Sequence, residues 1–268
     1  MAIARLGPGH DGAVLPFLIQ DEPWSVIPFD AFLRYGMGHP EHLWFGEWEG
    51  GRLRGIIYGH KRFVYVYYPS NPLRSGLNDF LSSHYPRFSF SGQPTRAAWL
   101  IRQLPSYYAH HVDRSAFVQQ SPLTFQRLQG YGKMKGEKVQ VRTADRHDFG
   151  SLLNLYKDSE VAHEVDPAFL KQLLEDRRVL VAERGELVGS VMLLKESWRY
   201  ALLGGLFVAP PYRNLGVAAQ LGRAIMMLVR DRGKKACFYY RLPTLTSFYE
   251  KGAFLPLGLW DEIHFTSK

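Results

Sequence analysis

The junction between an apolar segment and an amphipathic helix constrains the fold of this chain more than any other feature. The segment Tyr200–Val208 is apolar throughout, which is typical of a buried strand, and prolines follow it directly. A helical pattern begins immediately after Gly216, and Gly233 is placed to end the helix. The apolar stripe of this helix consists of Val217, Leu221, Ala224, Ile225, Leu228 and Val229.

Two glycines, Gly204 and Gly205, interrupt the predicted strand. A glycine pair inside a strand is typical of a β-bulge or of a close approach by another backbone. Because a bulged strand leaves backbone N–H and C=O groups without ladder partners, this segment could offer them to a ligand. The sequence therefore predicts an irregular strand just before the helix.

The loop that opens the helix has the composition of an anion site. The first N–H groups of a helix have no intrahelical partner, and the helix dipole is positive there. A small residue at Gly216 and at Ala218 would let a phosphate approach the backbone, and Arg213 adds a fixed positive charge. This chemistry suits a pyrophosphate, and an ordinary strand–helix turn is the alternative. Neither G-x-x-x-x-G-K-[ST] nor G-x-G-x-x-G occurs at this junction, so the loop gives no support for ATP or NAD binding.

The rest of the second half favours a mixed α/β architecture with a central sheet and helices on its faces. Asp166 is the expected N-cap of a helix that Pro167 opens. The expected strands and helices, in chain order, are Val139–Arg142, Asp148–Tyr156, Pro167–Leu174, Val179–Glu183, Glu186–Leu194, Tyr200–Val208, the long helix, Ala236–Arg241, Leu245–Lys251 and Leu257–Phe265.

A segment rich in glycine and lysine, residues 130–137, reads as a linker between two halves. A faint internal repeat supports this division. Arg5, His10 and Asp11 share their spacing with Arg142, His147 and Asp148, and the pattern E-x-G-x-L-x-G occurs at Glu49 and again at Glu183. We therefore expect a duplicated chain, with an N-terminal domain over 1–129 and a C-terminal domain over 138–268.

These landmarks resemble the GNAT superfamily of acyl-CoA-dependent N-acyltransferases. The signature [R/Q]-x-x-G-x-[G/A] after a V-x-P strand end corresponds here to Arg213-x-x-Gly216-x-Ala218 after Val208-x-Pro210. The segment Ser247–Phe254 is similar to the family's F-Y-x-x-x-G-F segment, with its glycine one position early. The N-terminal half shows only a broken signature near Arg74. The resemblance implies two tandem GNAT-like domains, each a mixed, mostly antiparallel sheet flanked by helices, with a degenerate N-terminal copy.

The resemblance further implies the site residues. Acetyl-CoA would lie between two splayed parallel strands, and Tyr249 matches the position of the general acid in many members, where a core aromatic is the alternative. No acidic residue lies in Tyr200–Val208, so the usual carboxylate base is not found. Acidic residues from Asp158 to Asp166 would favour a cationic amine acceptor. The positions matching the family's acetyl-CoA contacts are Leu206, Phe207, Val208, Arg213, Asn214, Leu215, Gly216, Val217 and Ala218.

Composition narrows the partners and the location. The net charge of +8, without any basic run that resembles a nucleic-acid-binding arm, favours small anions over nucleic acid. The single cysteine, Cys237, excludes an internal disulfide, and no metal site is expected from His39-x-x-His42 or His110-His111. No apolar run is long enough for a membrane span, so a cytoplasmic location is expected.

The function expected from these features is N-acetylation of an amine by acetyl-CoA, in a ternary complex and by direct attack. Two alternatives remain open. One is a tandem GNAT transferase that uses aminoacyl-tRNA, and the other is a non-catalytic CoA-binding sensor or scaffold. The acceptor, the general base and the oligomeric state are not readable from the sequence.

Overall fold

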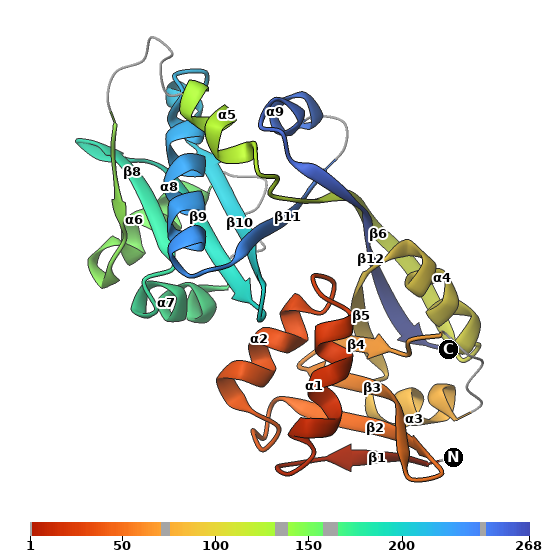
Figure 1. The fold of residues 1–268 in the computed structure, drawn as a ribbon. Helices are drawn as coiled ribbons and strands as arrows, with labels where there is room; N and C mark the ends of the chain where they lie inside the picture. Colours follow the sequence, from red (N-terminus) through yellow and green to blue (C-terminus); the bar gives the residue numbers. More distant parts are fainter. Residues whose placement is uncertain (1, 71–75, 132–138, 158–165, 242–244) are drawn as a thin grey trace. The chain divides into compact units, whose positions relative to one another are not determined.

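The computed structural model describes residues 2–70, 76–131, 139–157, 166–241 and 245–268. The chain forms two compact units, and each unit is built from separate chain segments (Figure 1). Unit 1 comprises Met1–Phe117, Tyr239–Pro243 and Leu257–Lys268. Unit 2 comprises Val118–Phe238 and Thr244–Pro256.

Unit 1 contains a mixed sheet whose strands lie in the order β1-β2-β3-β4-β5-β12-β6. Among the strand pairs of this sheet whose residue partners are assigned, β4 and β5 are parallel and the others are antiparallel. The elements are β1 (Ala2–Leu6), α1 (Asp11–Gln20), α2 (Val26–Tyr35), β2 (Leu43–Glu49), β3 (Arg52–His60), β4 (Phe63–Tyr67), α3 (Leu77–His84), β5 (Arg87–Gly92), α4 (Pro94–Gln103), β6 (Tyr107–Gln119) and β12 (Leu255–Ser267).

Unit 2 contains strands in the order β11-β10-β9-β8-β7, of which only β10 and β11 are parallel. Its elements are α5 (Thr124–Tyr131), β7 (Gln140–Thr143), α6 (Phe149–Lys157), α7 (Pro167–Glu175), β8 (Val179–Arg184), β9 (Glu186–Glu196), β10 (Tyr200–Val208), α8 (Val217–Asp231), β11 (Lys235–Arg241) and α9 (Thr246–Lys251). The mixed α/β fold class predicted from the sequence is confirmed.

Local signals placed most of these elements correctly. The Asp166 side chain accepts a hydrogen bond from Ala168 N at 2.9 Å and so caps α7 as expected. The helix predicted from Asp148 begins instead at Phe149, because Arg146–Asp148 form a 3-10 turn whose N-cap is Asp145 and whose capping box is completed by Asp148. Its carboxylate accepts from Asp145 N at 2.9 Å and also binds the Arg142 guanidinium, which lowers the pKa of Asp148.

The two halves of the chain repeat one order of elements: a strand, two helices, three strands, a helix, a strand, a helix and a strand. The repeated glycine pattern falls on equivalent hairpins, where Gly51 and Gly185 both have positive φ, at +73° and +75°. The chain segments of the two compact units differ from the predicted domains 1–129 and 138–268. The division into these two domains stays a prediction. Of the expected linker, Gly130 and Tyr131 end α5, and residues 132–137 lie outside the described residues.

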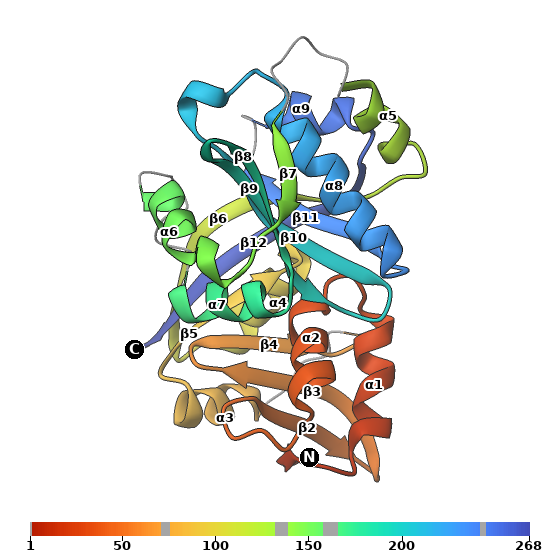
Figure 2. The ribbon, with the colours of Figure 1, turned by 90° about the vertical axis from the view of Figure 1, so that its left-hand side faces the viewer.

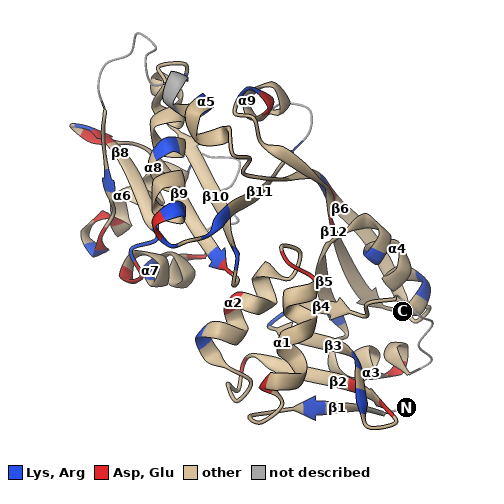
Figure 3. Cartoon of the chain, viewed as in Figure 1, with Lys and Arg blue, Asp and Glu red and all other residues tan. Residues whose placement is uncertain are grey.

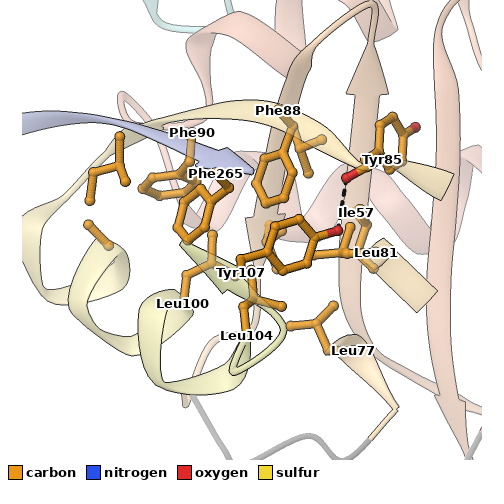
Figure 4. Close-up of a cluster of buried hydrophobic side chains, with 14 of the residues drawn as sticks. Ile57, Leu77, Leu81, Tyr85, Phe88, Phe90, Leu100, Leu104, Tyr107 and Phe265 are labelled. Carbon is orange, nitrogen blue, oxygen red and sulfur yellow. Dashed lines mark hydrogen bonds between the residues drawn. The ribbon is translucent and has the colours of Figure 1, made fainter. Parts of the chain in front are cut away.

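The last strand, β12, completes the sheet of unit 1 rather than that of unit 2. Its residues from Asp261 to Thr266 pair antiparallel with β5, from Gly92 to Arg87. Phe265 is only 1% exposed and stacks on Phe88 in the core of this unit (Figure 4). The Tyr107 hydroxyl closes the cluster by donating to the Tyr85 carbonyl at 2.8 Å.

In unit 2, helices cover both faces of the sheet (Figure 2). On one face, Leu152 and Tyr156 of α6 pack with residues of α7 and with Met192 of β9. On the other face, the apolar stripe of α8 is buried, and Leu221 lies beside Gly189. Because successive strand residues point to opposite faces of a sheet, Gly189 lies on the face covered by α8 and its neighbour Ser190 on the face covered by α6.

Candidate functional site

The parallel strands β10 and β11 pair over only part of their length. Their register joins Tyr200 to Lys235 and Leu202 to Cys237, and within the described residues the ladder ends there. From Leu203 onward, therefore, no described strand is in register with the edge of β10 that faced β11.

β10 also carries the predicted bulge. Gly204 pairs with Met192 of β9, whereas the next residue in register is Phe207, which pairs with Ser190. One extra residue therefore sits in β10 across from β9, and Gly205 takes a positive φ of +61°. The glycine pair is explained by this geometry: a Cβ on Gly205 would lie 3.0 Å from the Tyr156 hydroxyl.

Sequence reasoning missed the residue that holds the bulge. Tyr156 of α6 is buried, and its hydroxyl donates to the Gly205 carbonyl at 2.7 Å and contacts the Ser190 hydroxyl. Burial raises the pKa of Tyr156 well above that of a free tyrosine, so the phenol keeps its proton. The sequence showed this residue only as part of an apolar helix stripe, which gives no sign of a polar contact across the sheet.

The loop Arg213–Gly216 folds back on the end of β10. Arg213 Nε donates to the Val208 carbonyl at 3.0 Å, and its guanidinium lies 5.6 Å from the Phe207 ring centroid. Both Asn214 and Gly216 have positive φ, at +63° and +78°. A Cβ built on Gly216 meets nothing within 4 Å, so the space beside it is open.

The backbone N–H groups of this loop are available to a ligand. Those of residues 214–218 donate no hydrogen bond to any residue that the structure describes. They gather at the N-terminus of α8, where the helix dipole is positive. Successive free N–H groups beside left-handed residues form the concave arrangement that binds anions.

The position predicted for the acid lies on the short helix α9. The half-buried Tyr249 ring packs on Phe238 of β11, with centroids 4.7 Å apart, and edge-on to Phe254 at 5.9 Å. Phe238 directly follows Cys237, the last residue of β11 in register with β10. Cys237 is fully buried, which agrees with its interpretation as an apolar core residue.

Two basic side chains next to or in β11, Lys234 and Arg241, already have polar partners. Lys234 Nζ donates to the carbonyls of Ser197 and Trp198, and Arg241 pairs with Asp113 at 3.2 Å. Asp158, Glu160 and Glu164, which belong to the acidic segment expected to favour a cationic acceptor, lie outside the described residues. Lysines and arginines are spread over the elements of both units (Figure 3).

The histidine pair His39 and His42 belongs to a group of packed rings in unit 1. The His42 ring is sandwiched between Tyr35, at 4.2 Å, and His60, at 4.3 Å, and its Nδ1 contacts the Tyr58 hydroxyl at 2.7 Å. The described part of the chain contains no group of three His, Cys, Asp or Glu residues arranged to hold a metal ion.

No helix within the described residues is both long enough and apolar enough to cross a membrane.

Comparison with known families and structures places this geometry in context. Residues 175–254 match the family model of the acetyltransferase (GNAT) domain, which spans β8 to α9. No curated protein sequence matches the chain.

Solved structures share the fold over the whole chain. A GNAT-family acetyltransferase from Colwellia psychrerythraea is 14% identical, with all of both chains covered and a TM-score of 0.59. A tandem GNAT protein from the clavulanic acid biosynthesis pathway is 14% identical, with 98% of this chain and 97% of that chain covered and a TM-score of 0.63. A GCN5-related N-acetyltransferase from Sphaerobacter thermophilus is 16% identical, with 99% and 95% covered and a TM-score of 0.63. At these identities the similarity shows a shared fold.

Proposed function

We propose, from the match of residues 175–254 to the GNAT acetyltransferase family model, that the chain transfers an acetyl group from acetyl-CoA to an amine in unit 2. The observation that carries the proposal is the row of free N–H groups at residues 214–218, which directly follows the bulged strand β10. Anionic groups of a nucleotide cofactor are the ligands that such a row of donors suits.

The residues at the C-terminal end of β10 and in the loop that follows it fit acetyl-CoA. The N–H groups predicted to hold the pyrophosphate run from Arg213 to Ala218; that of Arg213 donates to the Pro210 carbonyl at 3.2 Å, so those of residues 214–218 would bind it, and the open space beside Gly216 leaves room for it. The unpaired edge of Leu206, Phe207 and Val208 would pair with the amide groups of the pantetheine arm. Acetyl-CoA itself supplies an activated thioester, and its acyl group passes to a neutral amine by direct attack.

The chain's own groups would then assist the transfer. An N–H group near Phe207 or Val208 would donate to the thioester carbonyl oxygen as negative charge develops on it, a contribution worth about 3 kcal/mol in comparable sites. The Tyr249 hydroxyl would protonate the departing thiolate. Since β10 carries no acidic residue, the proton of the amine would leave through water rather than through a strand carboxylate.

A calorimetric titration with acetyl-CoA tests the cofactor, and thiol release with a panel of amines tests the transfer. One binding site and turnover with an amine would support the proposal. Turnover with cationic amines alone would support the acidic loop as the acceptor-binding site. Binding without turnover would favour a CoA sensor. The absence of acetyl-CoA binding, together with tRNA binding that weakens steeply with salt, would favour the aminoacyl-tRNA alternative.

The Tyr249→Phe variant tests the proposed acid. The phenylalanine keeps the ring contacts with Phe238 and Phe254 but has no proton to donate. We expect kcat to fall by about a hundredfold, the lower end of the range for general acid catalysis, with the Kd for acetyl-CoA unchanged. Steady-state rates with a single amine measure this, and an unchanged kcat would assign Tyr249 to the core alone.

A further inference from the structure

The bulge in β10 is held by a chain of two hydroxyl groups that come from different elements. Ser190 of β9 and Tyr156 of α6 are both buried, and their hydroxyls contact each other. The Tyr156 hydroxyl also lies 2.7 Å from the Gly205 carbonyl oxygen. A phenol has one proton, so if Tyr156 donates it to Gly205, Ser190 must donate to the Tyr156 oxygen. With this assignment each hydroxyl donates one hydrogen bond, and the donors run in one direction, from Ser190 through Tyr156 to Gly205.

Through the planar peptide bond, the contact at the Gly205 carbonyl also affects the N–H group of Leu206, on the edge of β10 that is proposed to bind the cofactor. The Gly205 carbonyl and the Leu206 N–H belong to the same planar trans peptide, so they point in opposite directions. A phenol that fixes the carbonyl therefore also fixes the aim of the Leu206 N–H, away from Tyr156. Leu206 has no residue opposite it in the register with β9 and lies beyond the end of the ladder with β11.

We propose that Tyr156, with Ser190 as its hydrogen-bond donor, is a positioning residue that aims the Leu206 N–H at the pantetheine arm of the cofactor. The inference rests on the proposed function, because the ligand of that N–H is taken to be acyl-CoA. Tyr156 acts through Gly205 and touches neither the cofactor nor the acceptor.

The surroundings of the bulge support a positioning role. Gly205 has a φ of +61°, which glycine adopts without steric cost, and the absence of a Cβ leaves room for the Tyr156 hydroxyl, which would lie 3.0 Å from one. The Tyr156 ring packs near Phe207 at 5.9 Å, so the same side chain supports the segment on both sides of Leu206. Because burial raises the pKa of Tyr156, its donor proton persists throughout the pH range in which acyltransferases are assayed.

Tyr156→Phe removes the donor but keeps the ring, and two measurements follow its effect. The first is amide hydrogen exchange in the segment 203–208, compared with β8 as an internal reference. The second is the Kd for CoA by calorimetry. We expect exchange in 203–208 to be about tenfold faster and CoA binding about tenfold weaker, with β8 unchanged.

Two further variants sharpen the test. Ser190→Ala keeps the bond from Tyr156 to Gly205 and removes the donor to the phenol oxygen, together with the long contact of the Ser190 hydroxyl to the Gly205 carbonyl at 3.5 Å. Its effect on exchange should therefore be smaller than that of Tyr156→Phe. Tyr108→Phe makes the same chemical change at a side chain that is 66% exposed and should leave both measurements unchanged.

The outcomes separate this inference from the proposed function. Unchanged exchange in 203–208 in Tyr156→Phe would overturn the inference, and so would faster exchange of equal size in 203–208 and β8, which indicates general loss of stability. If the unmodified protein binds no CoA, the proposed function fails, and the exchange data alone then decide whether Tyr156 holds the bulge.

Discussion

Replacement of Phe265 by alanine is expected to destabilise unit 1 by about 3–5 kcal/mol, the usual cost of removing a buried aromatic ring. Phe265 is 1% exposed, stacks on Phe88 at 4.7 Å and meets Tyr107 edge-on at 6.2 Å (Figure 4). The surrounding side chains come from β5, α4 and β6, which cannot close together over the empty volume without breaking strand pairing. A loss of this size is a large part of the stability of an ordinary domain.

Hydrogen exchange resolved by segment measures this effect where it should occur. Protection is expected to fall in β3, β4 and β5 and to persist in β8 and β9. Thr266→Ala, an exposed neighbour on the same strand, is the matched control and should change neither group of strands. Loss of protection confined to β8 and β9 would contradict the assignment of β12 to unit 1.

Replacement of Gly216 by glutamate is expected to weaken acetyl-CoA binding by about a hundredfold or more. The new carboxylate would lie among the N–H groups proposed to bind the pyrophosphate. Repulsion between this carboxylate and a phosphate group about 4 Å away, in partly screened surroundings, costs several kcal/mol. The backbone of Gly216 has a φ of +78°, which costs a non-glycine residue about 1–2 kcal/mol. Since a Cβ there meets nothing within 4 Å, we expect the fold to persist.

Calorimetry at matched protein concentration measures this loss, and thermal unfolding checks the fold. Gly222→Ala changes a glycine inside α8, the helix that Gly216 precedes, and the new Cβ would only touch Leu128 at 4.0 Å. This control should bind acetyl-CoA normally and stabilise α8 slightly, by about 0.5–1 kcal/mol. Unweakened binding by Gly216→Glu would remove the loop from the proposed site.

The sequence by itself determined the features that depend on neighbouring residues. The strand Tyr200–Val208, its bulge and the helix after Gly216 were all readable, because periodicity and glycine placement act over a few residues. The position of the candidate anion loop followed from the same short-range signals. So did the duplicated order of elements, since each hairpin and helix carries its own start and stop.

Only the tertiary structure decided which sheet each strand completes and which polar groups meet. The segment Leu257–Phe265 was predicted as a strand, but its alternating pattern is compatible with any apolar sheet edge, and it pairs with β5, far away in the chain. The contact from Tyr156 to Gly205 likewise joins residues 49 apart in sequence. A tyrosine on an apolar stripe has the same periodicity whether or not its hydroxyl finds a partner. Pairing and buried hydrogen bonds are chosen by packing of the whole chain, and no local pattern encodes them.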